Sequence, residues 1–243
     1  QDQWPSHYPF IVVTPQLRRD PSVEDPADQK WPPEMIDEVI EYVRSGYTVD
    51  GTRMYITGLS QGSHGSYDYT VAHPEKMAAA VYISGAPDST VACSAKDVPI
   101  WNFHGTDDGL VPPVFGPALI RALEACSPPG KFRPHLNMLY GRRHEGWNEI
   151  YNLSSGYDIY SWMLKFKKNS SANTVPYVSA GADMTIADRD HYLHVYGDAF
   201  DSDGRISSIQ WTKISGPAVT MEETHTPFLR LSNFSPGTYE FRI

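Results

Sequence analysis

Residues 53–62 read RMYITGLSQG, a strand-like run that leads directly into a G-x-S-x-G pattern. The residues after it, 63–72, favour a helix. Between a strand and a helix, this pattern predicts a nucleophile elbow, a sharp turn that holds Ser60 exposed and slightly strained. A serine hydroxyl is a poor nucleophile at neutral pH, so the motif implies a base, an orienting acid and an oxyanion site elsewhere in the chain.

Strand and helix signals alternate outward from this turn through the first two thirds of the chain. Short apolar runs typical of buried strands occur at residues 9–14, 53–57, 78–83, 99–104 and 136–140. Helical patterns occur at residues 32–46, 63–72, 114–125 and 157–166. This succession predicts an α/β fold, a mostly parallel sheet with helices on both faces.

The character of the sequence changes after Lys168. A polar stretch without periodicity, residues 169–175, reads as a linker between a domain at 1–168 and a module at 176–243. Short alternating segments separated by turn residues predict strands in this module at residues 183–187, 191–196, 206–212, 228–231 and 238–243. We expect a small antiparallel β-sandwich there.

Composition narrows the partners of this chain. Its 243 residues carry 20 basic and 29 acidic side chains, a formal charge of −9, which argues against a nucleic-acid partner. No apolar run approaches the ~20 residues that span a bilayer. We expect neither a metal nor a cofactor, because no metal-ligand spacing is present among His7, His73, His135, His191, His194 and His225. Nothing in the sequence indicates an oligomeric state.

Candidates for the acid and the base follow two predicted strands. Asp107 and Asp108 come after the strand at 99–104, and His144 comes after the strand that ends at Tyr140. Open α/β sheets place ligands at the carboxyl ends of their strands. The chain order serine, aspartate, histidine is that of α/β hydrolases. His104 and Gly105 are expected to shape the turn that carries the acid.

Three motifs, ITGLSQG, HGTDDGLVP and His-x-x-Trp, give residues 9–168 a specific resemblance. The segment resembles the carboxylesterase and polyhydroxyalkanoate-depolymerase-like branch of the α/β hydrolases, which includes feruloyl and acetyl-xylan esterases. The resemblance implies a serine carboxylesterase that acts on small-molecule or polymer-linked esters through Ser60, His144 and Asp108. Asp107 is then a bystander.

The remaining parts of the site are less complete. The backbone N–H of Gln61 is the expected first oxyanion donor, and Leu59 and Trp147 are candidates for the substrate pocket, although Trp147 could equally belong to the core. The second oxyanion donor of this fold comes from a loop after an earlier strand. Eight residues before Pro9 cannot hold that strand and its predecessors, and the chain stops at Ile243 inside a predicted strand. Either the chain is a fragment, or another backbone group acts as the second donor. We expect truncation at both ends, with the first strands lacking.

Residues 176–243 resemble a polycystic-kidney-disease-type immunoglobulin-like domain, through SAGAD at 179–183, the DSDG turn at 201–204, IQW at 209–211 and GTY at 237–239. Such modules accompany secreted bacterial enzymes that act on polymers, so the resemblance implies an extracellular protein. The two cysteines, Cys93 and Cys126, flank one βα unit at the same end of the sheet. They could form a disulfide or remain buried free thiols.

Two other functions remain open from the sequence. A serine peptidase would use the same three residues, because ester and amide hydrolysis share this acyl chemistry. A binding module with an impaired hydrolase half would also fit, if the second oxyanion donor is missing.

Overall fold

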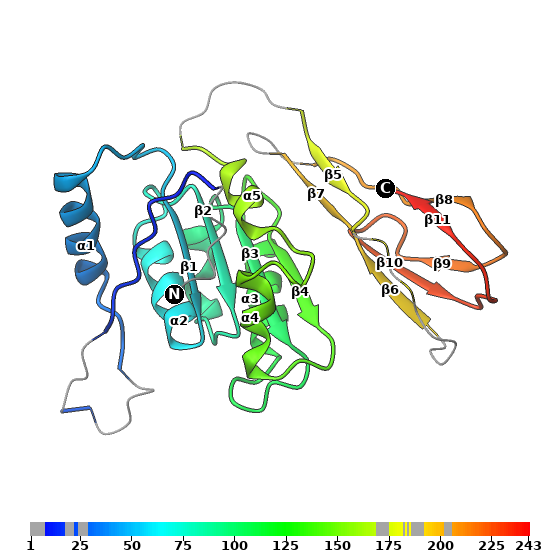
Figure 1. The fold of residues 1–243 in the computed structure, drawn as a ribbon, viewed down its shortest axis with the longest axis horizontal. Coiled ribbons are helices and arrows are strands. Elements are labelled where there is room, and N and C mark those ends of the chain that lie inside the picture. Colours follow the sequence, from blue (N-terminus) through cyan, green and yellow to red (C-terminus); the bar gives the residue numbers. More distant parts are fainter. Residues whose placement is uncertain are drawn as a thin grey trace. The chain divides into compact units, whose positions relative to one another are not determined.

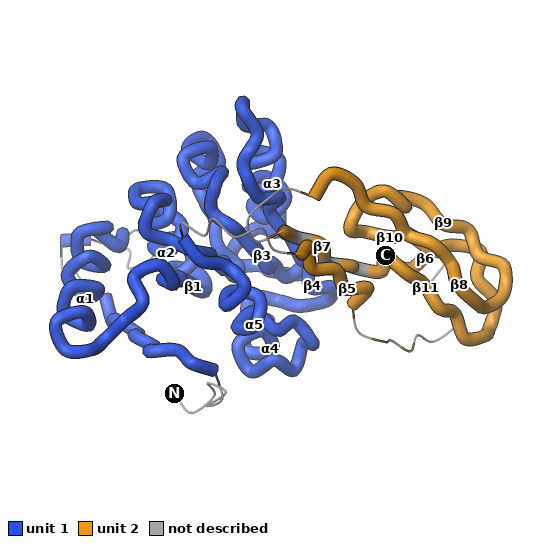
Figure 2. Tube along the Cα trace, turned by 90° about the horizontal axis from the view of Figure 1, so that it is seen from above, with its two compact units in different colours: residues 1–171 blue, residues 172–243 orange. Residues whose placement is uncertain are grey.

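The computed structural model describes residues 8–17, 22–23, 29–168, 175–181, 183, 185, 192–201 and 206–243. The chain divides into two compact units, residues 1–171 and 172–243, coloured separately in Figure 2. The expected linker, 169–175, lies outside the described residues except for Val175. Each unit has a hydrophobic core of its own.

The first unit is built on four strands, β1 (Tyr55–Leu59), β2 (Ala79–Ile83), β3 (Ile100–Gly105) and β4 (His135–Leu139). They lie side by side in chain order and are all parallel (Figure 1). Parallel neighbours need long crossovers, which here contain α2 (Gln61–Ala72), η2 (Ser89–Ala95) and α3 (Phe115–Glu124). The predicted parallel α/β fold is therefore confirmed, and the carboxyl ends of all four strands meet at one edge.

Helices cover both faces of this sheet because successive strand residues point to opposite sides. On one face Ile100 joins a core with Tyr69 of α2 and Leu119 of α3. On the other face the ring of Trp101 lies 5.2 Å from that of Trp162 in α5 (Ile159–Leu164). Figure 2 shows α2 and α3 on one side of the strands and α5 on the other.

The outer helix α1 (Pro33–Gly46) begins at a proline, as the sequence predicts. Its apolar side chains Ile36 and Ile40 pack against the core under α2 and α3. Asp37 of the same helix accepts hydrogen bonds from Tyr69 (2.5 Å) and Lys76 (2.6 Å), which hold α1 against α2 and the segment after it. No helix in the described part of the chain is long and apolar enough to cross a membrane.

The strand predicted at residues 9–14 is absent, and this expectation was wrong. Ile11, Val12 and Val13 are 51%, 42% and 45% exposed, whereas a strand covered on both faces would bury them. Phe10 is half-buried, with its ring 5.7 Å from that of Tyr55. A strand exists only where its backbone pairs with a neighbour, and within the described residues β1 pairs with β2 alone. The apolar composition of a segment does not show whether a neighbouring strand pairs with it.

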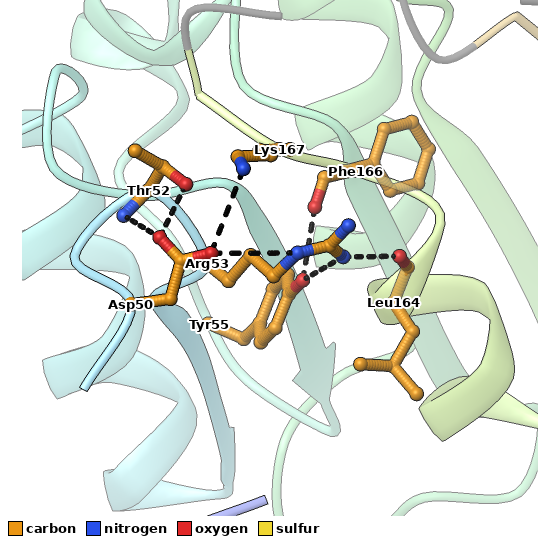
Figure 3. A network of polar contacts seen from close by, with 7 residues as sticks. All are labelled: Asp50, Thr52, Arg53, Tyr55, Leu164, Phe166 and Lys167. Atoms are coloured by element: carbon orange, nitrogen blue, oxygen red, sulfur yellow. Dashed lines mark hydrogen bonds and ion pairs between the residues drawn. The ribbon is translucent and has the colours of Figure 1, made fainter. Parts of the chain in front are cut away.

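Polar contacts join the amino end of β1 to the last residue of α5 and to the segment after it (Figure 3). The Arg53 guanidinium donates to the Leu164 carbonyl (2.8 Å), and the Tyr55 hydroxyl donates to the Phe166 carbonyl (2.9 Å). Oδ2 of Asp50 lies 3.7 Å from Nε of Arg53, and Oδ1 of Asp50 accepts hydrogen bonds from the N–H and the hydroxyl of Thr52. These contacts fix β1 at the end opposite to Ser60.

A disulfide joins Cys93 in η2 to Cys126 just after α3, with their Cα atoms 5.6 Å apart. Of the two arrangements that the sequence left open, the structure therefore has the disulfide. The bond ties two crossover segments that cover the same face of the sheet. The short η2 was not predicted, because a segment of 7 residues shows little helical periodicity.

The second unit consists of short antiparallel strands, as expected. The strands are β5 (Tyr177–Ser179), β6 (Tyr192–Tyr196), β7 (Asp198–Phe200), β8 (Thr212–Ser215), β9 (Thr220–Glu222), β10 (Phe228–Ser232) and β11 (Glu240–Arg242). Three of them form the sheet β6-β10-β9, and the others pair as β11-β8 and β5-β7 (Figure 1). Trp211, 1% exposed, belongs to the core of this unit, and its indole N–H donates to the Thr226 carbonyl (3.0 Å).

Strand boundaries in this unit differ from the predicted ones. The expected strand at 206–212 begins only at Thr212, because Ile209 and Trp211 are buried in the core without a backbone ladder. The expected strand at 183–187 falls largely outside the described residues, and the DSDG turn lies outside them except for Asp201. Strands β5, β7 and β9, each of 3 residues, were missed because they are too short to show alternation.

Candidate active site

Ser60 occupies a strained turn between β1 and α2. Its backbone has φ 50° and ψ −121°, a region that non-glycine residues rarely adopt. The Ser60 N–H donates to the Ile83 carbonyl (2.9 Å), which extends the parallel ladder by one residue. The Ser60 carbonyl accepts from the N–H groups of Ser63 (2.9 Å) and His64 (3.1 Å), so the helix begins at once. This is the geometry expected of a nucleophile elbow.

The two glycines of the motif have different reasons to be there. A Cβ on Gly58 would collide with the backbone carbonyl of Gly62, whereas a Cβ on Gly62 would meet no atom within 4 Å. The strand therefore approaches the first turn of α2 too closely for any side chain at position 58. Only Gly58 is required by contact in the described structure.

Asp108 lies buried in the loop after β3 and is 5% exposed. Its Oδ1 accepts hydrogen bonds from the N–H groups of Leu110 (3.0 Å) and Val111 (2.9 Å), and its Oδ2 accepts from Nδ1 of His144 (2.8 Å). Burial acts to raise the pKa of this carboxyl. The hydrogen bonds from Val111, His144 and Leu110 outweigh burial, so the pKa lies below its ordinary value. Asp108 is thus held as a carboxylate.

His144 begins η3 (His144–Gly146), which follows β4 and leads into α4 (Trp147–Tyr151). Its side chain is 14% exposed, whereas that of Asp108 is 0% exposed, so the imidazole is the member of the pair that reaches solvent. Because Nδ1 faces a carboxylate, the proton of the neutral ring belongs on Nδ1. The other nitrogen, Nε2, is then free to act as a base.

The loops that carry Asp108 and His144 are joined directly. The Asp107 N–H donates to the Arg142 carbonyl (3.0 Å), and the Gly141 N–H donates to Oγ1 of Thr106 (2.9 Å). A Cβ on Gly105 would collide with the same Arg142 carbonyl. Glycine at position 105 therefore permits the close approach that brings the aspartate and the histidine together.

Ser60 and the Asp108–His144 pair come from the same edge of the sheet, at the ends of β1, β3 and β4. Within the described residues, no hydrogen bond joins the Ser60 hydroxyl to His144. In hydrolases this contact is commonly long in the absence of substrate and shortens when substrate binds. The roles assigned to the three residues therefore stay predictions.

The other predicted site residues also lie at or after the ends of these strands. Gln61 is the first residue of α2, and its side-chain Nε2 donates to the Gln29 carbonyl (2.9 Å). Leu59 ends β1 and Trp147 begins α4, and both are half-buried. Asp107 is exposed and accepts from the hydroxyl of Thr106 (2.9 Å). The aspartate that contacts His144 is Asp108.

One buried histidine beside this pair was not assigned to the site from the sequence. His104, at the end of β3, is 0% exposed, and its Nε2 lies 3.0 Å from the Val111 carbonyl and 3.5 Å from Oδ2 of Asp108. His104 is the first residue of the HGTDDGLVP run, and this position is the sequence feature that could have assigned it to the site. No group of three or more metal-binding side chains occurs among the residues that the structure describes.

Comparison with known proteins identifies the family of the first unit. The profile described as phospholipase/carboxylesterase matches residues 17–155, more than half of the chain. The chain belongs to the phospholipase/carboxylesterase family. This confirms the predicted α/β-hydrolase fold and the resemblance of the first unit to carboxylesterases. A second profile, described as K319L-like, PKD domain, matches residues 180–243 and confirms the resemblance of the second unit.

Individual relatives cover only part of this chain. A bifunctional acetylxylan esterase/xylanase, XynS20E from Neocallimastix patriciarum, is 27% identical over 105 residues, which are 42% of this chain and 15% of that protein. The crystal structure of a thermostable esterase is 27% identical, with a TM-score of 0.49, over 55% of this chain and 36% of that one. SOBER1 from Arabidopsis thaliana is 23% identical, with a TM-score of 0.41, over 55% of this chain and 61% of its own.

Proposed function

We propose that this chain hydrolyses carboxylic esters with Ser60 as nucleophile, His144 as general base and Asp108 as the orienting acid. The observation that carries the proposal is the 2.8 Å hydrogen bond between His144 and the buried Asp108. This pair lies at the same edge of the sheet as the strained turn at Ser60, which leads into α2. Membership of the phospholipase/carboxylesterase family supports it independently.

The chemistry follows from these positions. Nε2 of His144 takes the proton of Ser60 as its hydroxyl oxygen attacks the ester carbonyl, and the tetrahedral intermediate then collapses to an acyl-enzyme. The same nitrogen returns the proton to the departing alcohol, and a water molecule deacylates the serine by the reverse steps. Asp108 keeps the Nδ1 proton in place and stabilises the imidazolium while it exists.

The start of α2 supplies the oxyanion donor. The first N–H groups of a helix have no partner within the helix, and the helix dipole favours negative charge at this end. The N–H of Gln61 follows the nucleophile directly, so it is the donor that we assign. Loss of one such donor typically costs about 10²–10³ in rate.

We further propose a polymer-linked ester, acetylated or feruloylated polysaccharide, as the substrate, and an extracellular location in bacteria. The name of the Neocallimastix relative, an acetylxylan esterase/xylanase, supports the substrate class. The disulfide and the PKD-type unit support the location, because disulfides persist mainly in oxidising compartments.

Labelling with a fluorophosphonate tests the nucleophile. We expect stoichiometric labelling of the parent chain, none of the Ser60→Ala variant, and unchanged labelling of Ser84→Ala, which removes another strained serine of the same sheet edge. Labelling that persists in Ser60→Ala would exclude the proposed mechanism. No labelling of the parent chain would favour a binding module.

A substrate panel then separates ester from peptide hydrolysis and defines the acyl group. Turnover of p-nitrophenyl acetate and butyrate is compared with that of peptide anilides, and release of acetate from acetylated xylan with release of ferulate from methyl ferulate. We expect ester turnover to exceed anilide turnover by orders of magnitude. A preference for the anilides would overturn the esterase proposal in favour of a peptidase.

A further inference from the structure

His104 is a fully buried histidine that contacts the loop after β3, which carries Asp108. Its side chain extends from β3, and Nε2 lies 3.0 Å from the Val111 carbonyl oxygen and 3.5 Å from Oδ2 of Asp108. Both of these atoms are acceptors, and one of them is charged. The Nε2 atom must therefore carry a proton, because an unprotonated nitrogen would face two oxygen lone-pair systems with no donor between them.

The surroundings of the other ring nitrogen, Nδ1, indicate that the ring is neutral. Nδ1 of His104 is buried and has no hydrogen-bond partner among the described residues. A second proton placed there would be a buried donor without an acceptor, which is costly. Burial also lowers the pKa of His104. This effect outweighs those of the Val111 carbonyl and Asp108, which both favour the charged form of the ring. His104 is thus a neutral imidazole, and its single N–H, at Nε2, faces the Val111 carbonyl and Asp108.

Helix α3 packs closely over His104. A Cβ on Gly116 of α3 would lie 3.4 Å from Cβ of His104 and 3.5 Å from Nδ2 of the buried Asn102. The side chain of His104 is 0% exposed, so the imidazole is enclosed by protein atoms.

Val111 connects this donor to the catalytic pair. Its N–H donates to Oδ1 of Asp108, while its carbonyl accepts from Nε2 of His104. The Val111 backbone therefore links His104 to Oδ1 of Asp108. The other oxygen, Oδ2, lies 3.5 Å from Nε2 of His104 and 2.8 Å from Nδ1 of His144.

From this arrangement we propose that His104 is a positioning residue, whose Nε2 proton fixes Asp108 and its loop in the orientation that binds His144. The inference rests on the proposed hydrolase function. It assigns His104 no contact with substrate, and its effect acts through Asp108 alone.

Three substitutions separate the donor from the shape of the side chain. His104→Gln can place an amide N–H near the position of Nε2, His104→Asn carries the same group too short to reach, and His104→Leu keeps the volume without any donor. We expect kcat for p-nitrophenyl acetate to fall about three- to tenfold in His104→Leu and His104→Asn, as for loss of one hydrogen bond between neutral groups. KM should change less than about twofold, and His104→Gln should recover most of kcat.

Active sites are counted by fluorophosphonate titration, and folding is followed by circular dichroism, so that kcat refers to folded enzyme. Equal kcat in the parent and in His104→Leu would overturn the proposal, as would equal losses in folded His104→Gln and His104→Asn. If His104→Leu does not fold, the two polar variants decide alone. Full activity of Ser60→Ala would instead refute the proposed function, which is a distinct outcome.

Proton NMR gives a readout that does not need turnover. A proton shared between imidazole Nδ1 and a carboxylate resonates far downfield, and loss of the signal in His144→Ala assigns it to this pair. We expect the signal to persist in His104→Gln and to shift or broaden by exchange in His104→Asn. An unchanged signal in folded His104→Asn would show that the pair is positioned without His104.

Discussion

Ser60 and Ser84 have nearly the same positive φ angle, and each follows one of two neighbouring strands. Their φ angles are 50° and 48°, and neither residue is glycine. Each N–H extends the parallel ladder by donating at 2.9 Å to the next strand, Ser60 to Ile83 and Ser84 to Phe103. Backbone strain at the carboxyl edge of this sheet therefore does not by itself distinguish a nucleophile.

The two serines differ in the segment that each one leads into. Ser60 opens the twelve-residue helix α2 and is half-buried, whereas Ser84 is 2% exposed and leads into a loop. That loop is held against α2, because the Ala86 N–H donates to Nε2 of His64 (2.8 Å). A strained serine becomes a candidate nucleophile only where a helix N-terminus comes directly after it and its hydroxyl can be reached.

Removing each hydroxyl should give the largest contrast. Ser60→Ala should lower kcat for p-nitrophenyl acetate by about 10⁴–10⁶, as nucleophile loss does in other triad enzymes. Ser84→Ala should leave kcat within about twofold, because its hydroxyl has no part in the proposed chemistry. Steady-state kinetics on both variants checks this. Comparable losses in the two variants would mean that the elbow has been assigned to the wrong strand.

A second contrast compares two adjacent acids. Asp108→Asn should lower kcat about 10⁴-fold, because an amide at Oδ2 favours the wrong tautomer of His144. Asp107→Asn should change kcat less than about threefold, since its carboxylate is exposed and accepts from the neighbouring Thr106 hydroxyl. Both substitutions are nearly isosteric, so kinetics at matched folded concentration decides between them. A larger loss in Asp107→Asn would reverse the assignment of the acid.

The two glycines of the elbow allow a third contrast, in stability. Gly58→Ala should lower the free energy of unfolding by about 1–3 kcal/mol or more, because its methyl group meets the Gly62 carbonyl. Gly62→Ala should be neutral or slightly stabilising, since the space is open and alanine favours a helix. Urea denaturation gives both values. A neutral Gly58→Ala would show that the strand and the helix leave room for a side chain between them.

The smallest expected effect concerns pH. Because the folded-state pKa of Asp108 lies below the ordinary value of 3.8, its stabilising contribution is present above that value and is lost as the pH falls through the lower folded pKa. The stability difference between the parent and Asp108→Asn should be constant above about pH 5 and shrink below about pH 4. Urea denaturation across this range measures the difference. A gap that widens on acidification would mean that the carboxyl is protonated in the folded chain.

Local signals accounted for most of the first unit. Helices α1, α2 and α3 and strands β1 to β4 appeared close to their predicted places, because each is long enough to show its own periodicity. Residues 9–14 show the limit of that approach. They have a strand's composition, yet Ile11 to Val13 are exposed because no neighbouring strand pairs with them. Trp211 likewise lies in a buried segment without being in a strand.

The sequence by itself determined the elbow at Ser60, the order serine, aspartate, histidine, and the division into an α/β unit and a β unit. These features are written in neighbouring residues: glycines at a turn, apolar periodicity and a change in composition. The tertiary structure decided which residues meet. Asp108 and His144 are 36 residues apart in the chain and come together only because parallel strands end at one edge. The place of His104 beneath them was decided in the same way, by packing between strands and a helix that no local pattern records.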